Sequence, residues 1–530
     1  MNSRGLFKLL DISNVIKISV KVAGAKEILM AIKSQLDLVL VNPGNRGQIY
    51  QSLSTGISAI EPPVWAGLMA TFIRNKGFTL QIVDASADEL TPSQTADRTA
   101  ELNPLLTAVV VYGQQPSAST QVMAGASAVC TAIKQQYSNL KVLLLGGHVA
   151  SLPEGTLREE DAEFVAAGEG LYTLLELIQA LKTEQPDYSK VRGLWYWEGK
   201  TVKSNAPAPL LMNVEQEMPG IAWDLLPMSK YRAHNWHCFD GLQRQPYAAI
   251  YTTLGCPFHC SFCCIQAPFK SGEHELGYRE VTNSYRFWSP EAVMREIDIL
   301  VNQYGVRNIK IADEMFVLNP KHVLGICDAI IDRGYDLNIW AYARVDTIKD
   351  EMLDKLKRAG FNWLALGIEA ASDRVRDDVQ KGFDQEDVYK TIKKIQDAGI
   401  NIIGNYIFGL PEDDLETMQA TLDLALDLNC EFANFYSAMA YPGSQLYNNA
   451  IADGWALPKT WSGFSQHAVD TLPLPTKHLT ASEVLSFRDR AFQQYFSSPK
   501  YLDMIEKKFG IETMQHIKDM AAHKLERVYA

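Results

Sequence analysis

Three cysteines on one short loop are the residues of this chain best placed to do chemistry. Cys256, Cys260 and Cys263 stand in the stretch Gly-Cys-Pro-Phe-His-Cys-Ser-Phe-Cys, with the spacing C-x3-C-x2-C. Three thiolates so close together can grip one compact metal centre, and iron–sulfur clusters are held by cysteine thiolates. On a cluster of four irons, three ligands leave one iron open, and an open metal position is what catalysis needs. The spacing therefore predicts a catalytic iron–sulfur cluster.

Two other uses of these cysteines stay open as alternatives. A structural zinc site needs four ligands, usually two C-x2-C pairs or a Cys/His mixture at longer range. His259 or Cys264 would have to be the fourth ligand here, and four ligands so close together make a poor tetrahedral cage. Disulfides are typical of secreted proteins, and no secretory signal is expected before this chain. The remaining cysteines are interpreted as ordinary thiols: Cys130, Cys238, Cys264, Cys327 and Cys430.

The cysteine loop resembles the signature of the radical S-adenosylmethionine (SAM) enzymes. In that family the open iron chelates the amino and carboxylate groups of the methionine part of SAM. Phe262, between the second and third cysteines, resembles the family's aromatic residue near the adenine. The resemblance implies a [4Fe-4S] cluster and SAM as cofactors, and an electron donor such as flavodoxin or ferredoxin as a partner.

Composition limits the classes of protein to which this chain can belong. With 530 residues, 47% hydrophobic and 21% charged, the chain is expected to fold into two or more globular domains. A formal charge of −12 argues against a nucleic-acid partner, which would need a basic face. No apolar run approaches the roughly 18 to 20 residues of a membrane span, so no transmembrane segment is expected. Free thiols and an oxygen-sensitive cluster predict a reducing cytoplasmic location.

The first 35 residues are locally basic and form a separate N-terminal extension. The stretch from Phe7 to Lys33 can be interpreted in two ways. It could lie on an anionic membrane surface, or it could be a cap packed on the next domain, which is the interpretation we favour.

Short apolar runs alternate with helix-like segments from Leu36 onward. The expected strands are Leu36–Val41, Leu80–Val83, Ala108–Val111, Lys141–Leu145 and Phe164–Ala166. The expected helices between them are Pro62–Lys76, Thr120–Gln136 and Pro153–Arg158. Strands that alternate with helices predict a parallel, doubly wound sheet in an α/β domain.

Small and polar residues follow these strands, where ligands of doubly wound sheets bind. They are Asn42, Gly44, Gly113, Gln114, Gly146, Gly147, His148, Gly168, Glu169 and Gly170. The Gly-Gly-x-x-x-Ser run from Gly146 and the Gly-Glu-Gly run from Gly168 resemble the cobalamin-binding domain that precedes many radical SAM enzymes. That resemblance implies cobalamin as a third cofactor, with these residues around it.

The chain departs from the best-known cobalamin motif, D-x-H-x-x-G, which supplies a histidine to cobalt. The matching loop here is Asn-Pro-Gly-Asn-Arg-Gly at positions 42–47, without a histidine. A histidine from this loop is therefore not expected beneath the cobalt. His148 is a candidate neighbour of the corrin, and a hydrogen-bonded loop histidine is the alternative.

From Tyr247 a second series of strand–helix units begins. The expected strands are Tyr247–Thr253, Asn308–Ala312, Asn338–Ala343, Trp363–Gly367, Asn401–Phe408 and Phe432–Ala438. The expected helices are Pro290–Tyr304, Pro320–Asp332, Lys349–Ala359, Gln385–Ala398 and Leu415–Leu428. Six such units predict a partial (β/α)6 barrel similar to a TIM barrel, with reactive groups at the carboxyl ends of its strands.

The predicted domain organisation has five parts. They are an N-terminal extension (1–35), a Rossmann-like cobalamin-binding domain (36–185), a hairpin and linker (186–245), a radical SAM partial barrel (246–450) and a C-terminal helical region (451–530).

Four charged residues lie at the ends of the expected barrel strands. Asp313 and Glu314 follow the second strand, Arg344 the third and Glu369 the fourth. A guanidinium can clamp a carboxylate with a bidentate fork, which suits Arg344 to the carboxylate of SAM. Glu369 can accept hydrogen bonds from the ribose hydroxyls or the ammonium, and Asp313 and Glu314 from the ammonium. The family uses strand-end positions similarly, so these four are expected to bind SAM.

The combined pattern is identified as that of a cobalamin-dependent (class B) radical SAM enzyme. The resemblance implies a C-methyltransferase that attacks an unactivated carbon through a 5′-deoxyadenosyl radical and methylcobalamin. The first alternative is non-methylating chemistry with the same cofactors, such as oxidative cyclisation or ring rearrangement. The second is a non-catalytic cobalamin-binding sensor or scaffold with a structural cluster. Methylthio transfer is disfavoured, because the first 180 residues hold Cys130 alone and not a second cysteine triad.

The substrate is expected to be a small molecule, and the sequence does not name it. Candidate pocket residues are the aromatic and histidine side chains Trp223, His234, Trp236, His237, Trp455 and Trp461. Packing is the alternative role for such residues in linkers.

Overall fold

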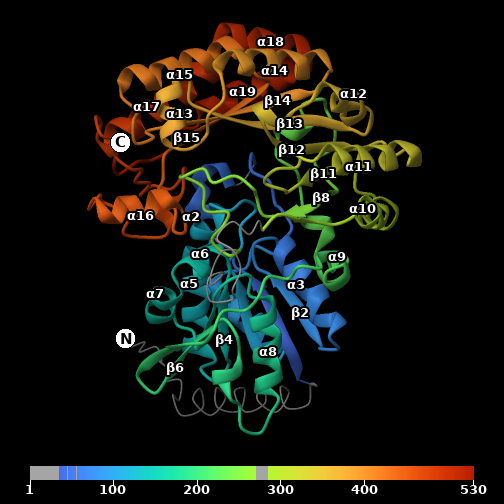
Figure 1. The fold of residues 1–530 in the computed structure, drawn as a ribbon, viewed down its shortest axis with the longest axis vertical. Coiled ribbons are helices and arrows are strands. Elements are labelled where there is room, and N and C mark those ends of the chain that lie inside the picture. Colours follow the sequence, from blue (N-terminus) through green and yellow to red (C-terminus); the bar gives the residue numbers. More distant parts are fainter. Residues whose placement is uncertain (1–34, 45, 55, 270–283) are drawn as a thin grey trace, which may run out of the picture.

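The chain is described here by a computed structural model, which covers residues 35–44, 46–54, 56–269 and 284–530. The basic stretch from Phe7 to Lys33 lies outside the described residues. An N-terminal sheet lies below a barrel-like sheet in Figure 1, and the C-terminal helices cover the barrel.

The N-terminal sheet has seven strands in the order β2-β1-β3-β4-β5-β6-β7. Its strands are β1 (Leu36–Asn42), β2 (Leu80–Asp84), β3 (Pro104–Val110), β4 (Val142–Leu145), β5 (Phe164–Ala166), β6 (Leu194–Glu198) and β7 (Thr201–Ser204). The first five strands pair in parallel. They are nearly continuous apolar runs, as expected when helices cover both faces of a sheet.

Among the described residues, seven helices accompany this sheet. They are α2 (Arg46–Tyr50), α3 (Val64–Asn75), α4 (Pro92–Glu101), α5 (Ala118–Gln136), α6 (Gly147–Ser151), α7 (Pro153–Glu159) and α8 (Leu171–Leu181). Helices α3, α5 and α7 match predicted segments, whereas α4 has a polar composition that hid it from an apolar pattern. A capping box fixes the start of α4, because the Thr91 side chain accepts from the Gln94 amide and the Gln94 side chain accepts from the Thr91 amide.

The predicted hairpin extends the N-terminal sheet. Strand β6 pairs antiparallel with β5, and β7 pairs antiparallel with β6. The chain then passes through α9 (Val214–Glu217) to the second sheet.

The second sheet contains six parallel strands in the order β15-β14-β13-β12-β11-β8. They are β8 (Tyr247–Ile250), β11 (Asn308–Ile311), β12 (Asn338–Arg344), β13 (Phe361–Glu369), β14 (Asn401–Phe408) and β15 (Phe432–Ser437). A short hairpin of β9 (Thr253–Leu254) and β10 (Arg286–Phe287) adjoins β8. The six-stranded parallel sheet is therefore present as predicted, and its first strand is shorter than expected.

Helices follow the barrel strands and cover their outer side. They are α10 (Pro290–Tyr304), α11 (Pro320–Arg333), α12 (Asp350–Arg358), α13 (Asp373–Asp378), α14 (Gln385–Asp397) and α15 (Leu415–Leu428). Their ends follow local sequence rules: Ser289 caps α10 in front of Pro290, and left-handed Gly305 ends it. The C-terminal region adds α16 (Gln445–Ala452), α17 (Ala481–Phe496), α18 (Pro499–Phe509) and α19 (Ile511–Ala522).

One apolar core runs through both sheets and the segment between them. It includes Phe72 on α3, Trp223 and Trp236 in the connecting segment, and Ile309 on β11. Continuous packing of this kind joins the two parts into one body, because separate cores would leave apolar surface exposed at the junction.

Candidate active site

The cysteine loop leaves the barrel directly after β8 and β9. Gly255 precedes the first cysteine with φ +80°, and a Cβ at this position would lie 2.6 Å from Ser284 Oγ and 2.7 Å from its carbonyl oxygen. Only glycine fits there without displacement. The Cys263 amide donates to the Cys260 carbonyl at 3.0 Å, which folds the loop into a tight turn. The loop is thus placed at the carboxyl end of the first barrel strand.

The three cysteines of the loop carry free thiols of unequal exposure. None of Cys256, Cys260 and Cys263 is in a disulfide; Cys256 is buried and the other two are half-buried. Within the described ranges, no group of three or more His, Cys, Asp or Glu side chains is arranged to hold one metal ion. Zinc draws its thiolates to about 2.3 Å from one centre, whereas the ligands of a four-iron cluster bind separate irons.

Arg344 stands beside the cysteine loop at the end of β12. Its Nη1 lies 3.7 Å from Cys260 Sγ, and its guanidinium stacks 4.0 Å from the Phe258 ring centre. Asp346 accepts from Nε at 2.9 Å and from Nη2 at 3.0 Å. This bidentate pair fixes the plane of the guanidinium and leaves Nη1 directed at the loop. The predicted convergence of Arg344 with the cysteines is therefore present.

Glu369 forms a buried ion pair that the sequence pattern did not reveal. Its Oε1 contacts Lys381 Nζ, and both side chains are less than a tenth exposed. Lys381 also lies 6.0 Å from the centre of the Phe262 ring. The pairing of β13 with β14 shifts between Gly367 and Glu369, and Glu369 has φ +63°. A bulge of this kind re-aims a side chain, and left-handed non-glycine residues cluster at functional sites.

Asp313 is fully buried and tied to the end of β8. Its carboxylate accepts from the Thr252 amide at 2.6 Å and from the Thr252 hydroxyl at 2.5 Å. That hydroxyl lies 2.9 Å from His322 Nε2. Asp313 thus links β11 to the strand that carries the cysteine loop.

A pH test follows from the burial of Asp313, which raises its pKa from 3.8 to about 6. Between these values the unfolded chain loses a proton that the folded chain keeps. The folded state then binds more protons, so its stability is full below about pH 4 and falls as the pH rises through about 6. The loss attributable to Asp313 is about 3 kcal/mol.

We expect Asp313→Asn to remove that part of the pH dependence. Urea unfolding of both proteins at a series of pH values from 4.5 to 7 measures it. Equal slopes of unfolding free energy against pH in the two proteins would contradict the assignment.

Glu314 faces the N-terminal sheet. It lines a small pocket together with Cys264 of the cysteine loop and Gly147 at the start of α6. Burial raises the pKa of Glu314 to about 8. The pocket is therefore lined by residues that follow the carboxyl ends of both β11 and β4.

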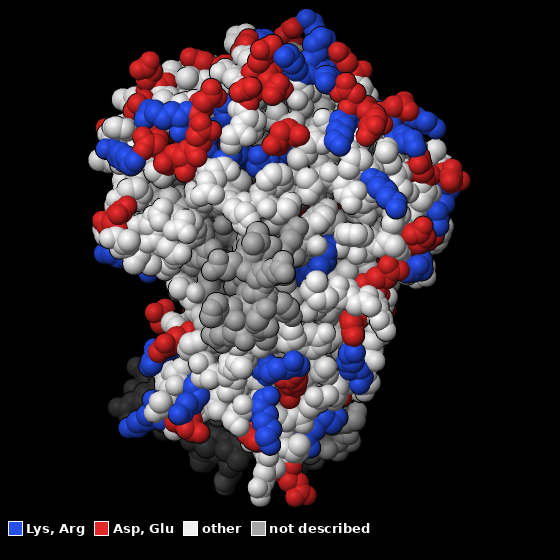
Figure 2. Space-filling view, in the orientation of Figure 1, with Lys and Arg blue, Asp and Glu red and all other residues white. Residues whose placement is uncertain are grey.

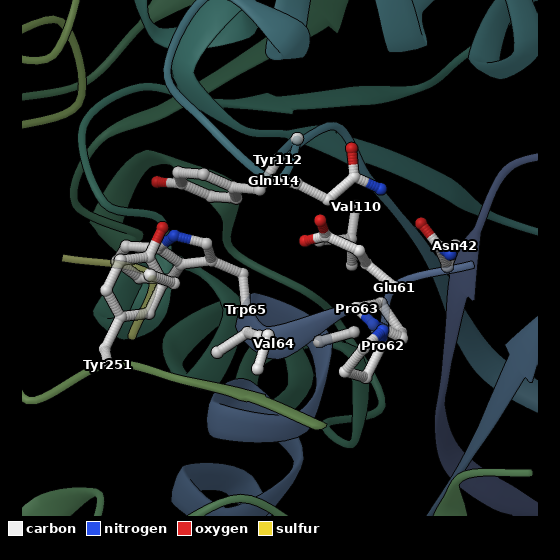
Figure 3. Close-up of a pocket in the computed structure, with 14 residues that line it drawn as sticks. Asn42, Glu61, Pro62, Pro63, Val64, Trp65, Val110, Tyr112, Gln114 and Tyr251 are labelled. Atoms are coloured by element: carbon white, nitrogen blue, oxygen red, sulfur yellow. The ribbon is translucent and has the colours of Figure 1, made fainter. Parts of the chain in front are cut away.

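Aromatic rings fill the adjoining part of this junction. Trp65 of α3 stacks on Tyr112 with ring centres 4.2 Å apart, and Tyr251, which follows β8, meets Trp65 edge-on at 6.2 Å. Figure 3 shows these rings on one side of a pocket, with the carboxylate of Glu61 and the amide of Gln114 on the other. Both sheets therefore contribute walls to one junction.

The residues expected around cobalamin fall into two groups. Some line cavities: Gly44 borders one of about 400 Å3, and Gly113, Gln114 and Gly147 border the junction with the barrel. The others have contacts within the fold. Asn42, which also borders the junction, donates to Asp84 Oδ1 at 2.7 Å.

The glycines of the second group lie where the backbone conformation or a close contact requires glycine. Gly146 has φ +146°, and a Cβ there would lie 2.1 Å from the Val111 carbonyl oxygen. Gly168 and Gly170 have φ values of +70° and +82°. These positions thus need glycine for local geometry, with or without a ligand.

His148 is buried and packs beside α5. Its Nδ1 lies 3.2 Å from Thr120 Oγ1, and its ring meets Trp461 edge-on at 4.5 Å. Burial lowers the pKa of His148 to about 3, so the ring is neutral at physiological pH. These contacts match the alternative of a hydrogen-bonded loop histidine.

Glu169 turns towards the barrel. Its Oε1 accepts from Arg286 Nη2 at 2.7 Å, and its Oε2 accepts from the Leu211 amide at 2.8 Å. Both side chains of the Glu169–Arg286 pair are 4% exposed. The carboxylate predicted to face a corrin is therefore engaged in a cross-domain ion pair.

Another cavity, of about 240 Å3, lies between the N-terminal sheet edge and the inside of the barrel. Its lining is mainly aromatic and carboxamide. The aromatic side chains are Tyr50, Trp236, Trp340, Tyr342, Phe432, Phe435, Tyr436 and Phe492. The carboxamide side chains are Gln114, Gln115, Gln121, Asn235, Asn405, Asn434 and Gln466.

A buried ion pair crosses this cavity wall. Lys310 of β11 lies 2.9 Å from Glu61 Oε2 and donates to the Gln114 carbonyl at 3.0 Å. His234 Nε2 stands 3.4 Å from the other oxygen of Glu61. The Lys310 ammonium and the hydrogen bond with His234 lower the pKa of Glu61 to about 2 despite its burial. Lys310 therefore ties two segments of the N-terminal sheet edge to the barrel.

Of the residues predicted to line a substrate pocket, some border the cavity and others have contacts within the fold. His234 and Trp236 line the cavity, while Trp223 donates to buried Glu296 and Trp461 packs on His148. His237 is fully buried.

The outer surface carries charges of both signs. Figure 2 shows acidic and basic side chains intermingled over the helices that cover the barrel. Among the described helices, none has the length and apolar character needed to cross a membrane.

Comparison with known proteins places the chain in a family. The model of the radical SAM superfamily matches residues 250–425. An uncharacterized methyltransferase of Pyrococcus horikoshii is 30% identical over 88% of this chain and 94% of its own length. The radical SAM methyltransferase TsrM of Kitasatospora setae, solved with cobalamin and a [4Fe-4S] cluster, shares the fold with a TM-score of 0.62. That match covers 91% of this chain and 99% of TsrM, at 16% identity.

The chain belongs to the radical SAM superfamily. The cobalamin-dependent radical SAM enzyme OxsB shares the fold with a TM-score of 0.66 at 15% identity, over 92% of this chain and 72% of OxsB. An anaerobic magnesium-protoporphyrin IX monomethyl ester cyclase of Rubrivivax gelatinosus is 26% identical over 75% of this chain and 68% of its own length. OxsB was solved with aqua-cobalamin and SAM bound. This radical SAM enzyme is related to methyltransferases.

Sequence reasoning missed the partners of the site residues. Lys381, Asp346 and Arg286 pair with Glu369, Arg344 and Glu169. Asp346 lies two residues from Arg344, and this short spacing was an available signal. No sequence signal pointed to Arg286 or Lys381, because each is separated from its partner along the chain and contacts it only in the folded protein.

Proposed function

We propose that this radical SAM enzyme is a C-methyltransferase that acts on an unactivated carbon of a small molecule. The observation that carries the proposal is that the ligand-binding edges of both sheets meet. Glu314 and Cys264 from the barrel share a pocket with Gly147 of the N-terminal sheet edge. A reaction that needs a radical source and a methyl donor at one carbon requires such a junction.

Cys256, Cys260 and Cys263 are proposed to hold three irons of the cluster. Arg344 is proposed to bind the carboxylate of SAM through Nη1, since Asp346 already fixes its other face. Glu369 is proposed to accept from SAM hydroxyls or the ammonium, with Lys381 holding its carboxylate in place. Phe262 borders the same space. When bound, the cluster and SAM supply radical generation, and cobalamin supplies the methyl group.

Asp313 and Glu314 are proposed to have unequal roles. Asp313 is occupied by two hydrogen bonds from Thr252, so it positions the end of β8 and adds negative charge for an ammonium. Glu314 lines the junction pocket and is the freer acceptor. Electrons are proposed to come from a flavodoxin or ferredoxin in a reducing cytoplasm.

The junction between the two sheets, formed by the cavity of about 240 Å3 and the small pockets that adjoin it, is the proposed seat of cobalamin. A corrin is a flat apolar ring with carboxamide side chains around its rim. Gln114, Gln115 and Gln121 from the N-terminal side and Asn405 and Asn434 from the barrel side offer matching amides, and aromatic rings offer the apolar surface. The donor set therefore fits the group. Asn42, Gly44, Gly113, Gly146, Gly168 and Gly170 stay predicted as neighbours of the corrin or its tail.

The test is mass spectrometry of small-molecule extracts from cells with and without the gene, supplied with deuterium-labelled methyl groups that enter SAM. We expect a product heavier by one labelled methyl group in cells with the gene, and 5′-deoxyadenosine from the purified enzyme. If the enzyme in these cells carries its cofactors and cleaves SAM, but no molecule gains a labelled methyl group, the proposal is contradicted.

Oxidative cyclisation is the second candidate, and the similarity to the Rubrivivax cyclase favours it specifically. The same extracts distinguish the two reactions. A cyclase would yield a product that has lost hydrogen and carries no label.

A further inference from the structure

A continuous chain of hydrogen bonds joins the N-terminal sheet edge to the first cluster cysteine. At one end Glu169 accepts from Arg286, which also donates to the Leu211 carbonyl at 2.7 Å and to the Ser284 carbonyl at 3.0 Å. Ser284 Oγ donates to Gln266 Oε1 at 2.9 Å. The Gln266 amide then donates to the Cys256 carbonyl at 2.5 Å.

The start of this hydrogen-bond chain lies at the junction between the two sheets, where cobalamin is proposed to bind. The Glu169 carbonyl accepts from the Tyr112 hydroxyl at 3.2 Å, and Tyr112 lines the junction pocket beside Trp65. Glu169 lies between two left-handed glycines after β5, so its backbone is held in a defined turn. A ligand seated against Tyr112 is therefore one hydrogen bond away from the backbone of Glu169.

The ion pair in the middle of this hydrogen-bond chain has little conformational freedom. Arg286 and Glu169 are each 4% exposed, and a planar guanidinium with three fixed acceptors has one orientation. Its charge centre also lies 5.2 Å from the Phe269 ring centre. Removing one partner would leave the other charge buried and unpaired, which is costly.

The end of the hydrogen-bond chain at Cys256 is also closely packed. Gly255, next to Cys256, has room only for hydrogen, because a methyl group there would lie 2.6 Å from the Ser284 hydroxyl oxygen and 2.7 Å from the Ser284 carbonyl oxygen. A shift of the Arg286–Ser284 segment therefore moves the residue in front of the first cluster ligand.

We propose that Arg286, through its ion pair with Glu169, couples the binding of cobalamin at the N-terminal sheet edge to the state of the cluster loop. Arg286 and Glu169 are positioning residues in this proposal, which rests on the proposed cobalamin site. Coupling is reciprocal: if an assembled cluster tightens cobalamin binding by some factor, cobalamin stabilises the cluster by the same factor.

The experiment measures the dissociation constant of hydroxocobalamin by anaerobic absorbance titration of the full chain, before and after cluster reconstitution. In the unmodified protein we expect the two constants to differ by at least about fivefold. In Arg286→Gln the ratio of the two constants should fall towards one. A general loss of stability would weaken both constants and leave their ratio unchanged.

Two further variants guard the interpretation. Arg286→Lys keeps a cation for Glu169 but cannot reach Leu211 and Ser284 together, so it should fold and show a reduced ratio. Arg192→Gln is the matched control, because Arg192 pairs with Glu176 in the same part of the fold but is about half exposed. Its ratio should equal that of the unmodified protein.

The outcomes separate the two proposals. Binding with equal constants in the unmodified protein, or an unchanged ratio in Arg286→Gln and Arg286→Lys, would overturn the coupling alone. Absence of hydroxocobalamin binding in both states would overturn the cobalamin site and the coupling with it.

Discussion

Cys260→Ala is expected to abolish the formation of 5′-deoxyadenosine and to remove most of the iron from the protein. Cys260 is one of three proposed ligands, and its sulfur is the one that Arg344 Nη1 approaches at 3.7 Å. Loss of a supporting group around a metal site already costs 10-fold to 100-fold, so loss of a ligand should cost at least about 100-fold in SAM cleavage. Iron analysis and chromatography of the reduced, reconstituted protein measure both effects.

Cys264→Ala is the matched control for this prediction. Cys264 follows Cys263 directly, is buried, and has a pKa raised by burial to about 12. It should keep its iron. Equal losses of iron in the two variants would contradict the ligand set, and so would full SAM cleavage by Cys260→Ala.

Glu369→Ala should abolish SAM binding and also destabilise the fold. The substitution leaves the ammonium of Lys381 buried without its carboxylate, and breaking a buried pair costs about 3 to 5 kcal/mol. A loss of activity in this variant alone would therefore not separate binding from folding.

The double variant Glu369→Gln with Lys381→Met makes that separation. It removes both charges and keeps similar volume, so stability should recover to near that of the unmodified protein. SAM binding should stay at least about 10-fold weaker, because an amide accepts hydrogen bonds less strongly than a carboxylate. Equilibrium dialysis with SAM and thermal unfolding provide the two readouts. Recovery of both stability and SAM affinity would assign Glu369 a purely structural role.

The sequence predicted the framework because strands and helices have local signals. Helix α10 has the predicted bounds, since Pro290 and Gly305 mark its ends, and strand β14 also has the predicted bounds, Asn401–Phe408. Cys256, Cys260 and Cys263 could be singled out because their chemistry depends on spacing along the chain. The order of strand-end residues likewise placed Arg344 beside the cysteine loop.

Other features depend on contacts between distant segments, which no local pattern encodes. Glu169 lies at a strand end as predicted, yet its carboxylate turns to Arg286, 117 residues further along the chain. Lys310 looks like an ordinary strand residue but joins Glu61 of the N-terminal part across the cavity wall. The β6–β7 hairpin joins the sheet because β5 offers it a free edge.

The account depends on a cluster with one open iron, held by three cysteines and able to bind SAM. Electron paramagnetic resonance of the anaerobically reduced protein, recorded with and without SAM, tests this most directly. The account predicts the signal of a reduced [4Fe-4S] cluster, with a line shape that changes when SAM binds the open iron. A protein without iron, with stoichiometric zinc, or with a cluster signal that SAM leaves unchanged would contradict it.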